Sequence, residues 1–305
     1  MNYSINLANP SKSQIRFNIT KFPDGQQSMT IVDVSIVASL VYDTNPLSSI
    51  TIMSHLNSFT DLELIILANR SVKEISDRIK VQLYIPYFLG ARSDRKFGEG
   101  SVNYVKEVIA PIINSQGFDR VTVLDPHSDV LEACINNFRK VSNLNLVEFA
   151  LDKIYGNSFK AEYSRFALVS PDGGSLKKIY DLAEALHYEN QIVIAAKHRD
   201  LQTGKIMSTN VHLTDYQKSL DMIIVDDICD GGRTFVELSK ALRAAGATGR
   251  IYLIITHGIF SAGLKALNPY FYEVFSTNSV VDMNDPQFSL MNDNELHKLQ
   301  QLNVY

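Results

Sequence analysis

The residues with the clearest chemical potential lie in segment 221–240, DMIIVDDICDGGRTFVELSK. An apolar run leads into two adjacent acids, Asp226 and Asp227, and a turn rich in glycine precedes an amphipathic stretch. Unpaired N–H groups at the first turn of a helix bind phosphate, and glycines let the backbone approach such an anion closely. Paired carboxylates accept hydrogen bonds from vicinal sugar hydroxyls. The pattern therefore indicates a sugar-phosphate site, in which Thr234 caps the helix or bonds a phosphate oxygen.

Charged side chains also follow other apolar runs. Arg92, Asp94 and Arg95 come after the run that ends at Ile85. Arginine suits a triphosphate because its planar fork donates several hydrogen bonds, although a solvated basic loop is the alternative interpretation. The segment AKHRD, at 196–200, is a further short basic stretch, which alone is typical of an exposed turn.

The strands and helices that must position these residues alternate regularly along the sequence. Short β-branched runs alternate with longer amphipathic stretches, which is typical of parallel α/β sheets. The expected strands are Ser49–Met53, Lys80–Ile85, Arg120–Leu124, Phe166–Ser170, Gln191–Ala195, Asp221–Val225 and Arg250–Thr256. The expected helices are Asp61–Ile79, Val102–Gln116, Ser175–Leu186 and Thr234–Ala245. Gly117 and Gly246 directly follow two of these helices and are predicted C-cap glycines.

This alternation of strands and helices occurs once before about residue 148 and again after it. A length of 305 residues is also typical of two domains. We expect an N-terminal α/β domain at 1–148, a second one at 149–285 and a polar, weakly helical tail at 286–305. The boundary itself is expected within 144–156.

Composition excludes several classes of protein. The net charge is −4, whereas nucleic-acid binders usually carry a strongly basic face. The two cysteines, Cys134 and Cys229, form no CxxC pair, which fits a reducing cytosol. The apolar runs are too short to span a bilayer. We therefore expect a soluble, cytoplasmic protein without nucleic-acid or membrane partners.

The glycine-rich turn resembles the PRPP-binding loop of type I phosphoribosyltransferases and PRPP synthetases. That loop usually reads two acids, two apolar residues and then Asp-Thr-Ala/Gly-Gly-Thr. Gly231 stands where threonine is usual, which removes a phosphate contact and opens space. Arg233 stands where glycine is usual, and it either adds donors for another phosphate or points to solvent. The resemblance implies a sugar-phosphate site made of Asp226, Asp227, Asp230, Gly231, Gly232, Arg233 and Thr234.

Two segments of the first half resemble the nucleotide motifs of PRPP synthetases. KFPDG, at 21–25, is similar to FPDGE, with Gln26 in place of the glutamate, and YIPYFLGARSDRK, at 84–96, is similar to IPYFGYARQDRK. The resemblance implies an ATP site formed by Phe22, Asp24, Gln26, Arg92, Asp94 and Arg95. After Lys96 the chain reads FGEGSVN where the family has KSRAPI-like residues, which argues against the familiar regulation by ADP or phosphate.

Further segments resemble the metal and catalytic motifs of the same synthetases. VLDPHSD is similar to MDLHASQ, and SPDGG is similar to SPDVGG, so His127 and Asp172 are the implied Mg²⁺ residues. AKHRD is similar to DKRRP, so Lys197 and Arg199 are the implied catalytic cations of a flexible loop. THGIFS, at 256–261, matches THGLFS.

This family resemblance implies two similar type I phosphoribosyltransferase-like domains, each with a mostly parallel sheet flanked by helices. The first would carry the nucleotide and metal motifs, and the second the catalytic and sugar-phosphate loops. The implied reaction transfers pyrophosphate from ATP to the anomeric hydroxyl of ribose 5-phosphate, giving PRPP and AMP with the help of Mg²⁺. A homo-oligomer with ATP bound at a subunit interface is also implied.

Three alternatives stay open. The altered loop would suit a ribose with a longer 5′ substituent, with ADP-ribose as the natural candidate and ADP-ribose 1-pyrophosphate as the product, in NAD metabolism. A non-catalytic, synthetase-like regulatory subunit would be expected to have lost its catalytic cations and metal acids. A phosphoribosyltransferase that consumes PRPP would have no use for the nucleotide motifs.

Overall fold

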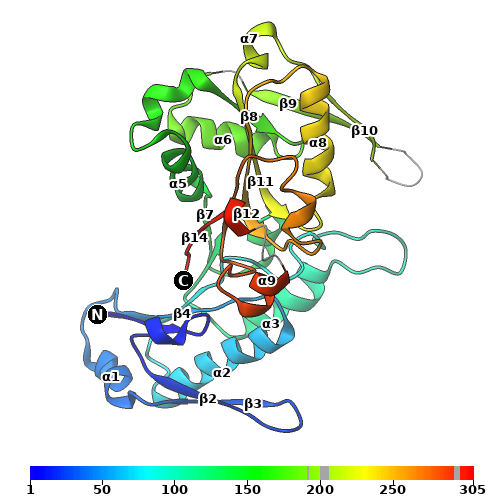
Figure 1. The fold of residues 1–305 in the computed structure, drawn as a ribbon. Helices are drawn as coiled ribbons and strands as arrows, with labels where there is room; N and C mark the ends of the chain where they lie inside the picture. Colours follow the sequence, from blue (N-terminus) through cyan, green and yellow to red (C-terminus); the bar gives the residue numbers. More distant parts are fainter. Residues whose placement is uncertain (191, 200–205, 292–295) are drawn as a thin grey trace. The chain divides into compact units, whose positions relative to one another are not determined.

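The computed structural model describes residues 1–190, 192–199, 206–291 and 296–305, and it divides into two compact units (Figure 1). The first unit comprises Met1–Val141 together with Tyr305, and the second comprises Ser142–Val304. The division thus falls just before the range 144–156 in which we expected it, because that range folds as helix α5 (Leu144–Tyr155) of the second unit. Within the described ranges no helix has the length and apolar character needed to cross a bilayer.

The first unit is built on a parallel five-stranded sheet in the order β1-β4-β5-β6-β7. Its strands are β1 (Asn2–Asn6), β4 (Ser49–Met53), β5 (Val81–Tyr84), β6 (Arg120–Leu124) and β7 (Phe138–Val141). The helices are α1 (Val34–Ser39), α2 (Phe59–Ile75), α3 (Ala110–Ser115), which continues a π-helical turn at Val105–Ile109, and α4 (Val130–Cys134).

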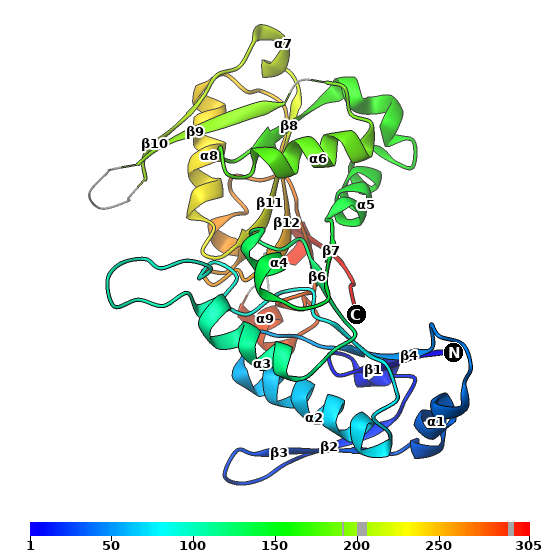
Figure 2. The ribbon, with the colours of Figure 1, turned by 180° about the vertical axis from the view of Figure 1, so that it is seen from behind.

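Helices α2 and α3 lie next to each other in Figures 1 and 2. The side-chain amide of Asn69 donates to the carbonyl of Gln116 at 2.9 Å and ties the two together. The hydroxyl of Ser58 accepts from the backbone N–H of Asp61, which is the expected N-cap contact of α2. A single apolar core fills this unit.

A separate antiparallel hairpin, β2 (Phe17–Lys21) and β3 (Gln27–Ile31), packs against α2. Met29 and Ile31 of β3 join the apolar core of the unit. A polar link is added by Gln27, whose backbone N–H and side-chain amide donate to the carboxylate of Glu63 at 3.1 and 3.0 Å. These bonds hold the pKa of Glu63 below its ordinary value. The hairpin is therefore a satellite of the helix rather than a part of the main sheet.

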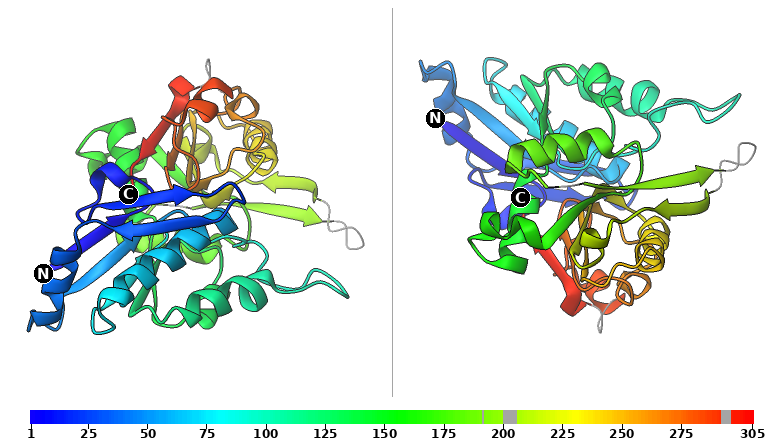
Figure 3. Two further views of the ribbon diagram at one scale, coloured as in Figure 1. Left: turned by 90° about the horizontal axis from the view of Figure 1, so that it is seen from below. Right: turned by 90° about the horizontal axis from the view of Figure 1, so that it is seen from above.

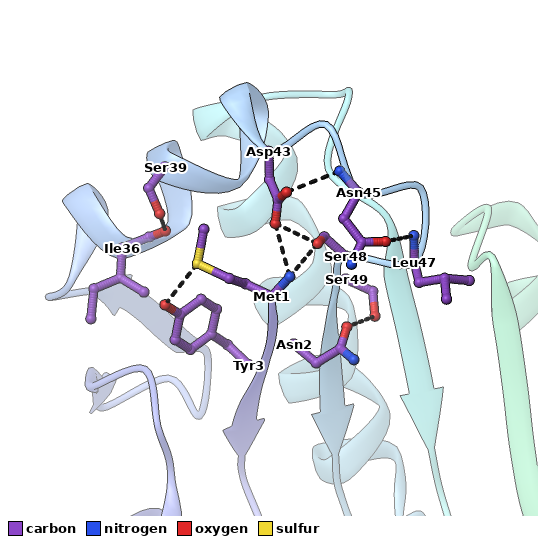
Figure 4. Close-up of polar contacts among 10 residues, drawn as sticks. All are labelled: Met1, Asn2, Tyr3, Ile36, Ser39, Asp43, Asn45, Leu47, Ser48 and Ser49. Carbon is purple, nitrogen blue, oxygen red and sulfur yellow. Dashed lines mark hydrogen bonds and ion pairs between the residues drawn. The ribbon is translucent and has the colours of Figure 1, made fainter.

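The loop before β4 is closed by short-range hydrogen bonds, drawn in Figure 4. The carboxylate of Asp43 accepts from the backbone N–H of Asn45 at 3.0 Å, and the side chain of Asn45 accepts from the N–H of Leu47 at 2.9 Å. Asx side chains commonly close turns by bonding the backbone two residues on. The amino group of Met1 also donates to Asp43, at 2.8 Å, which joins the starts of β1 and β4.

The second unit is built on a seven-stranded sheet in the order β10-β9-β8-β11-β12-β13-β14. Only β9 and β10 pair antiparallel, and the other neighbours are parallel. The strands are β8 (Phe166–Ser170), β9 (Val193–Arg199), β10 (Ile206–Val211), β11 (Asp221–Cys229), β12 (Ile251–Gly258), β13 (Val274–Thr277) and β14 (Leu299–Leu302). The other helices are α6 (Leu176–Leu186), α7 (Asp215–Lys218), α8 (Arg233–Ala244) and α9 (Pro286–Met291).

This sheet is covered on both faces, as its continuous apolar strands require. Phe166 and Leu168 pack in the core that includes α5 and α6, whereas Ala167 and Val169 pack in the core that includes α8. The alternation follows from the two-residue period of a strand. Figure 3, right, shows α6 and α8 on opposite sides of the sheet.

The sequence predicted this architecture well at its centre and less well at its edges. The expected α/β class with mostly parallel sheets is confirmed, as are the predicted C-cap glycines, Gly117 and Gly246, at φ of 67° and 98°. The segment 286–305 differs from the expected tail. It contributes α9 and the edge strand β14, which pairs with β13 in parallel.

Candidate functional site

Four neighbouring strands of the second unit end in the segments that the sequence singled out. Strands β9, β8, β11 and β12 lie side by side and run parallel, so their carboxyl ends share one edge of the sheet. Ligands of open α/β sheets bind at this edge. The segments that end or follow these strands contain Lys197 and Arg199, Asp172, Asp226 to Thr234, and Thr256 to Ser261.

The turn between β11 and α8 depends on Gly232. This residue is the N-cap of α8 and has a φ of 77°, in the left-handed region that favours glycine. A Cβ there would lie 2.7 Å from the Cδ2 of Leu267, which is buried. The helix begins at Arg233 without a side-chain cap or an acidic residue in its first turn, so Thr234 does not cap it.

Helix α6 begins at the same edge, and an acid bonds the turn that precedes it. The Oδ1 of Asp172 accepts from the backbone N–H groups of Gly174 and Ser175 at 3.0 and 3.1 Å. These two donors precede Leu176, the first residue of α6, so the carboxylate closes the turn that leads into the helix.

The two acids at the end of β11 have different surroundings. The Oδ2 of Asp227, which is buried, accepts from the Nζ of Lys178 at 2.9 Å. The Oδ1 of Asp226 accepts from the hydroxyl of Ser175 at 3.2 Å and from the backbone N–H of Asp227 at 3.1 Å. Burial, followed by the charges of Asp227 and Asp172, raises the pKa of Asp226, and Lys178 partly offsets this.

The implied catalytic cations lie on strand β9, where the sequence led us to expect a flexible loop. The backbone of Lys197 pairs with Thr209, and that of Arg199 pairs with Ile206, in the β9–β10 ladder. The side chains of Lys197 and Arg199 lie outside the part of the chain that the structure describes, as do all of residues 200–205.

The first unit also gathers predicted residues at adjacent strand ends. The loop with Arg92, Asp94 and Arg95 follows β5, and the segment with His127 follows the neighbouring β6. The hydroxyl of Ser128 donates to the carboxylate of Asp94 at 2.5 Å and joins the two segments. Arg92, Arg95 and His127 are exposed.

The predicted adenine residues lie elsewhere in this unit. Phe22, Asp24 and Gln26 are exposed at the tip of the β2–β3 hairpin. Figures 1 and 2 show this tip apart from the loop of residues 86–104. The structure therefore brings Asp94 and the His127 segment together but separates the hairpin tip from the arginines.

The implied metal residues, His127 and Asp172, belong to different units. Among the described residues no group of three or more histidine, cysteine, aspartate or glutamate side chains is arranged to hold a metal ion. The carboxylate of Asp172 and that of Asp226 do converge on one hydroxyl, that of Ser175, at 3.2 Å each. Carboxylate oxygens are the protein ligands that Mg²⁺ prefers, and Mg²⁺ usually needs only one or two of them beside phosphate and water.

Sequence reasoning did not identify Lys178, Ser175 or Ser261 as parts of this region. Lys178 lies on α6 and reaches an acid 49 residues away, while a lysine on an amphipathic helix is ordinarily a solvated residue. The matching THGIFS motif was the one available signal for Ser261.

Comparisons with known proteins identify relatives of this chain. Residues 141–287 match the model of the phosphoribosyl transferase domain. The chain is similar to the ribose-phosphate pyrophosphokinase of Mycoplasmopsis pulmonis, with 27% identity over 87% of this chain and 74% of the relative. It is also similar to that of Bradyrhizobium diazoefficiens, with 31% identity over 72% of this chain and 66% of the relative.

The fold matches a solved structure along nearly its whole length. The crystal structure of phosphoribosylpyrophosphate synthetase from Mycobacterium smegmatis has a TM-score of 0.74 at 17% identity and covers 99% of this chain and 94% of that one. The match supports two phosphoribosyltransferase-type units. The chain therefore belongs to the ribose-phosphate pyrophosphokinase family of transferase enzymes.

Proposed function

We propose that this protein transfers pyrophosphate from ATP to the anomeric hydroxyl of ribose 5-phosphate, giving PRPP and AMP. The observation that carries the proposal is the turn into α8. This helix begins after a Gly-Gly turn, with its N-cap Gly232 at a φ of 77°, and it has no side-chain cap and no acid in its first turn. A helix start of this kind suits a phosphate.

The acids next to this helix start would hold the sugar. We assign Asp226 and Asp227 to the ribose hydroxyls, and the loop of residues 230–234 to the 5-phosphate. Lys178 already engages one oxygen of Asp227, whereas the Oδ1 of Asp226 accepts from the hydroxyl of Ser175 and from the backbone N–H of Asp227. Asp226 is half-buried, so much water would be excluded from the ribose hydroxyls that donate hydrogen bonds to it.

Positioning and charge stabilisation dominate catalysis of phosphoryl-type transfers. Arg92 and Arg95 would hold the phosphates of ATP, with Asp94 fixing their loop through Ser128. Lys197 and Arg199, at the end of β9, would stabilise the negative charge that shifts to the leaving AMP.

Mg²⁺ is the metal that suits this proposal. Asp172 would hold it with its carboxylate, near Asp226, and His127 would act through the water shell because imidazole is not a preferred magnesium ligand. When bound, Mg²⁺ would neutralise charge on the ATP phosphate oxygens. Burial, and after it the neighbouring carboxylates, raise the pKa of Asp226, and a nearby cation would offset the effect of those carboxylates.

A second acceptor, ADP-ribose, is favoured by two particular residues. Gly231 leaves room, since the nearest atoms to a Cβ built on it would be the Oγ of Ser261 at 3.7 Å and the Cβ of Ala262 at 3.9 Å. Arg233 is exposed at the first position of α8 and could pair with a second phosphate. The product would then be ADP-ribose 1-pyrophosphate.

The proposal includes a homo-oligomer in the cytoplasm. The hairpin tip and the arginine loop lie apart within the first unit, which supports an ATP site to which two copies contribute. Cys134 is a free thiol, which suits a reducing compartment.

The first experiment is AMP release from ATP and Mg²⁺ with ribose 5-phosphate or ADP-ribose as acceptor, each product identified by mass. AMP together with a mass matching PRPP supports the primary proposal. AMP only with ADP-ribose supports the second candidate, and Arg233→Gly should then lower its use selectively. A purified, folded protein that releases AMP with neither acceptor would contradict both and favour a non-catalytic subunit.

A further inference from the structure

The segment Thr256–Ser261, THGIFS, has no role in the function proposed so far, yet its conformation is tightly specified. The backbone N–H groups of Ile259 and Phe260 both donate to the carbonyl of Cys229, at 2.8 and 3.2 Å. Phe260 is buried at 3% exposure and has a φ of 48°, in the left-handed region that a bulky residue rarely adopts. Such strain persists where the surroundings over-determine the conformation, and it clusters at functional sites.

Neighbouring residues show what enforces this conformation. A Cβ on Gly258 would lie 2.1 Å from the ring of Phe260, so a larger residue there would displace the ring. The ring of Phe260 in turn packs against the ring of Phe288, with 6.2 Å between the two ring centroids. The backbone hydrogen bonds to Cys229 thus fix the segment to the end of β11. Ser261 is the residue that directly follows this fixed part.

The hydroxyl of Ser261 reaches the sugar-phosphate loop. It donates to the Oδ1 of Asp230 at 2.5 Å, a short, charge-assisted bond. Ser261 is exposed, so the hydroxyl can rotate toward a ligand. The same Oγ lies 3.7 Å from the position that a Cβ on Gly231 would occupy. It therefore borders the space that the missing side chain of residue 231 leaves open.

We propose that Ser261 is a phosphate-binding residue of the sugar-phosphate site, whose hydroxyl turns from Asp230 to donate to the 5′-phosphate beside Gly231. The inference rests on the proposed function, because it takes the loop of residues 230–234 as the phosphate site. It assigns to the THGIFS segment the task of holding that hydroxyl in place. It also implies that Gly231 and Ser261 act together in this chain.

The test is a double-mutant cycle on the full chain, read by calorimetric titration of ribose 5-phosphate and by AMP release. Ser261→Ala should raise the Kd about tenfold, the usual effect of one hydrogen bond to a charged group. Ser261→Thr keeps the hydroxyl and should stay within about threefold of the original protein. In a Gly231→Thr background a second hydroxyl borders the same space. Ser261→Ala should therefore raise the Kd of that variant by less than about threefold. Ser219→Ala, an exposed serine that bonds the carbonyl of Tyr216, is the matched control.

The outcomes separate this inference from the function on which it rests. Normal binding by Ser261→Ala overturns the inference while the turnover of the original protein still supports the proposed function. The inference is also overturned if Ser261→Ala raises the Kd by the same factor with and without Gly231→Thr. Ser261 would then act only by orienting Asp230. If the original chain neither binds nor uses ribose 5-phosphate, the primary function has failed and the cycle is read with ADP-ribose. Binding of neither ligand overturns both.

Discussion

Lys178 makes the two acids at the end of β11 unequal. It pairs with Asp227, whose side chain is 7% exposed, and its own side chain is 26% exposed. Removing the counter-ion of a buried carboxylate lowers the stability of the folded protein strongly. Replacing both partners by apolar groups often leaves that stability unchanged. The pair is therefore a structural feature of the site as well as an electrostatic one.

We expect Lys178→Met to lower the free energy of unfolding by about 1–3 kcal/mol, since the ion pair is only partly shielded from water. The double variant Lys178→Met with Asp227→Leu should recover most of that loss. Urea unfolding of the three proteins measures this. A double variant that is as unstable as the single one would show that Lys178 stabilises the fold through contacts other than Asp227.

The catalytic assignment on β9 is also tested at the level of one residue. Lys197→Ala should keep the fold and lower kcat by roughly 100- to 1000-fold, the usual effect of removing one charge-stabilising donor. Lys160→Ala, an exposed lysine of the same unit, is the control. Steady-state AMP release and a thermal melt suffice, and normal turnover by Lys197→Ala would show that the assignment is wrong.

At the scale of elements, the turn into α8 distinguishes two adjacent glycines. Gly232→Ala places a Cβ in the left-handed region and 2.7 Å from the buried Leu267, so we expect it to lower the free energy of unfolding by about 2–4 kcal/mol. Gly231→Ala meets nothing closer than 3.7 Å and is the matched control, with a change below about 1 kcal/mol. Equal losses in denaturant unfolding would refute this account of the turn.

The attachment of the β2–β3 hairpin to α2 should depend on pH. The side-chain and backbone N–H groups of Gln27 hold the pKa of Glu63 below its ordinary value of about 4.3. A carboxyl with a lowered folded pKa contributes stability above its unfolded pKa, and this contribution is lost as pH falls through the folded pKa. Glu63→Gln should therefore lower Tm at pH 7 and have a shrinking effect as pH falls below about 4.

Melting curves of both proteins between pH 3 and pH 7 check this prediction. Asp215→Asn is a suitable comparison, because the pKa of Asp215 is also lowered, by Lys218, on a different element. A difference between Glu63→Gln and the original protein that stays constant with pH would mean that the charge of Glu63 is irrelevant to the hairpin.

At the scale of the whole molecule, the separation of the hairpin tip from the arginine loop predicts complementation between copies. Phe22→Ala and Arg95→Ala should each abolish most ATP use. If one ATP molecule contacts the hairpin of one copy and the arginines of another, mixed oligomers contain some intact sites. Random mixing in equal amounts should restore about a quarter of the original activity.

Co-refolding or co-expression of the two variants, followed by the AMP assay, measures the recovery. Two copies of the same variant mixed together provide the background. A mixture that gains nothing over this background would place both motifs of one ATP site in a single chain and would contradict the proposed interface.

The sequence by itself determined the central elements and the chemistry of the loop. The strands ending at Ser170, the helix after Gly232 and the left-handed glycines follow from local periodicity and backbone sterics, which act over a few residues. The order of the motifs along the chain was enough to indicate the family. The edge strands were not predictable in this way, because β14 is short and gains its stability only from pairing with β13.

Only the tertiary structure decided the partners of the functional groups. It pairs Asp227 with a lysine 49 residues away and Asp230 with a serine 31 residues away, and it joins Asp172 to the turn that precedes α6. Contacts of this kind depend on which strands become neighbours and in which register. A sequence records the side chains that are available, but the packing of the sheet selects which of them meet.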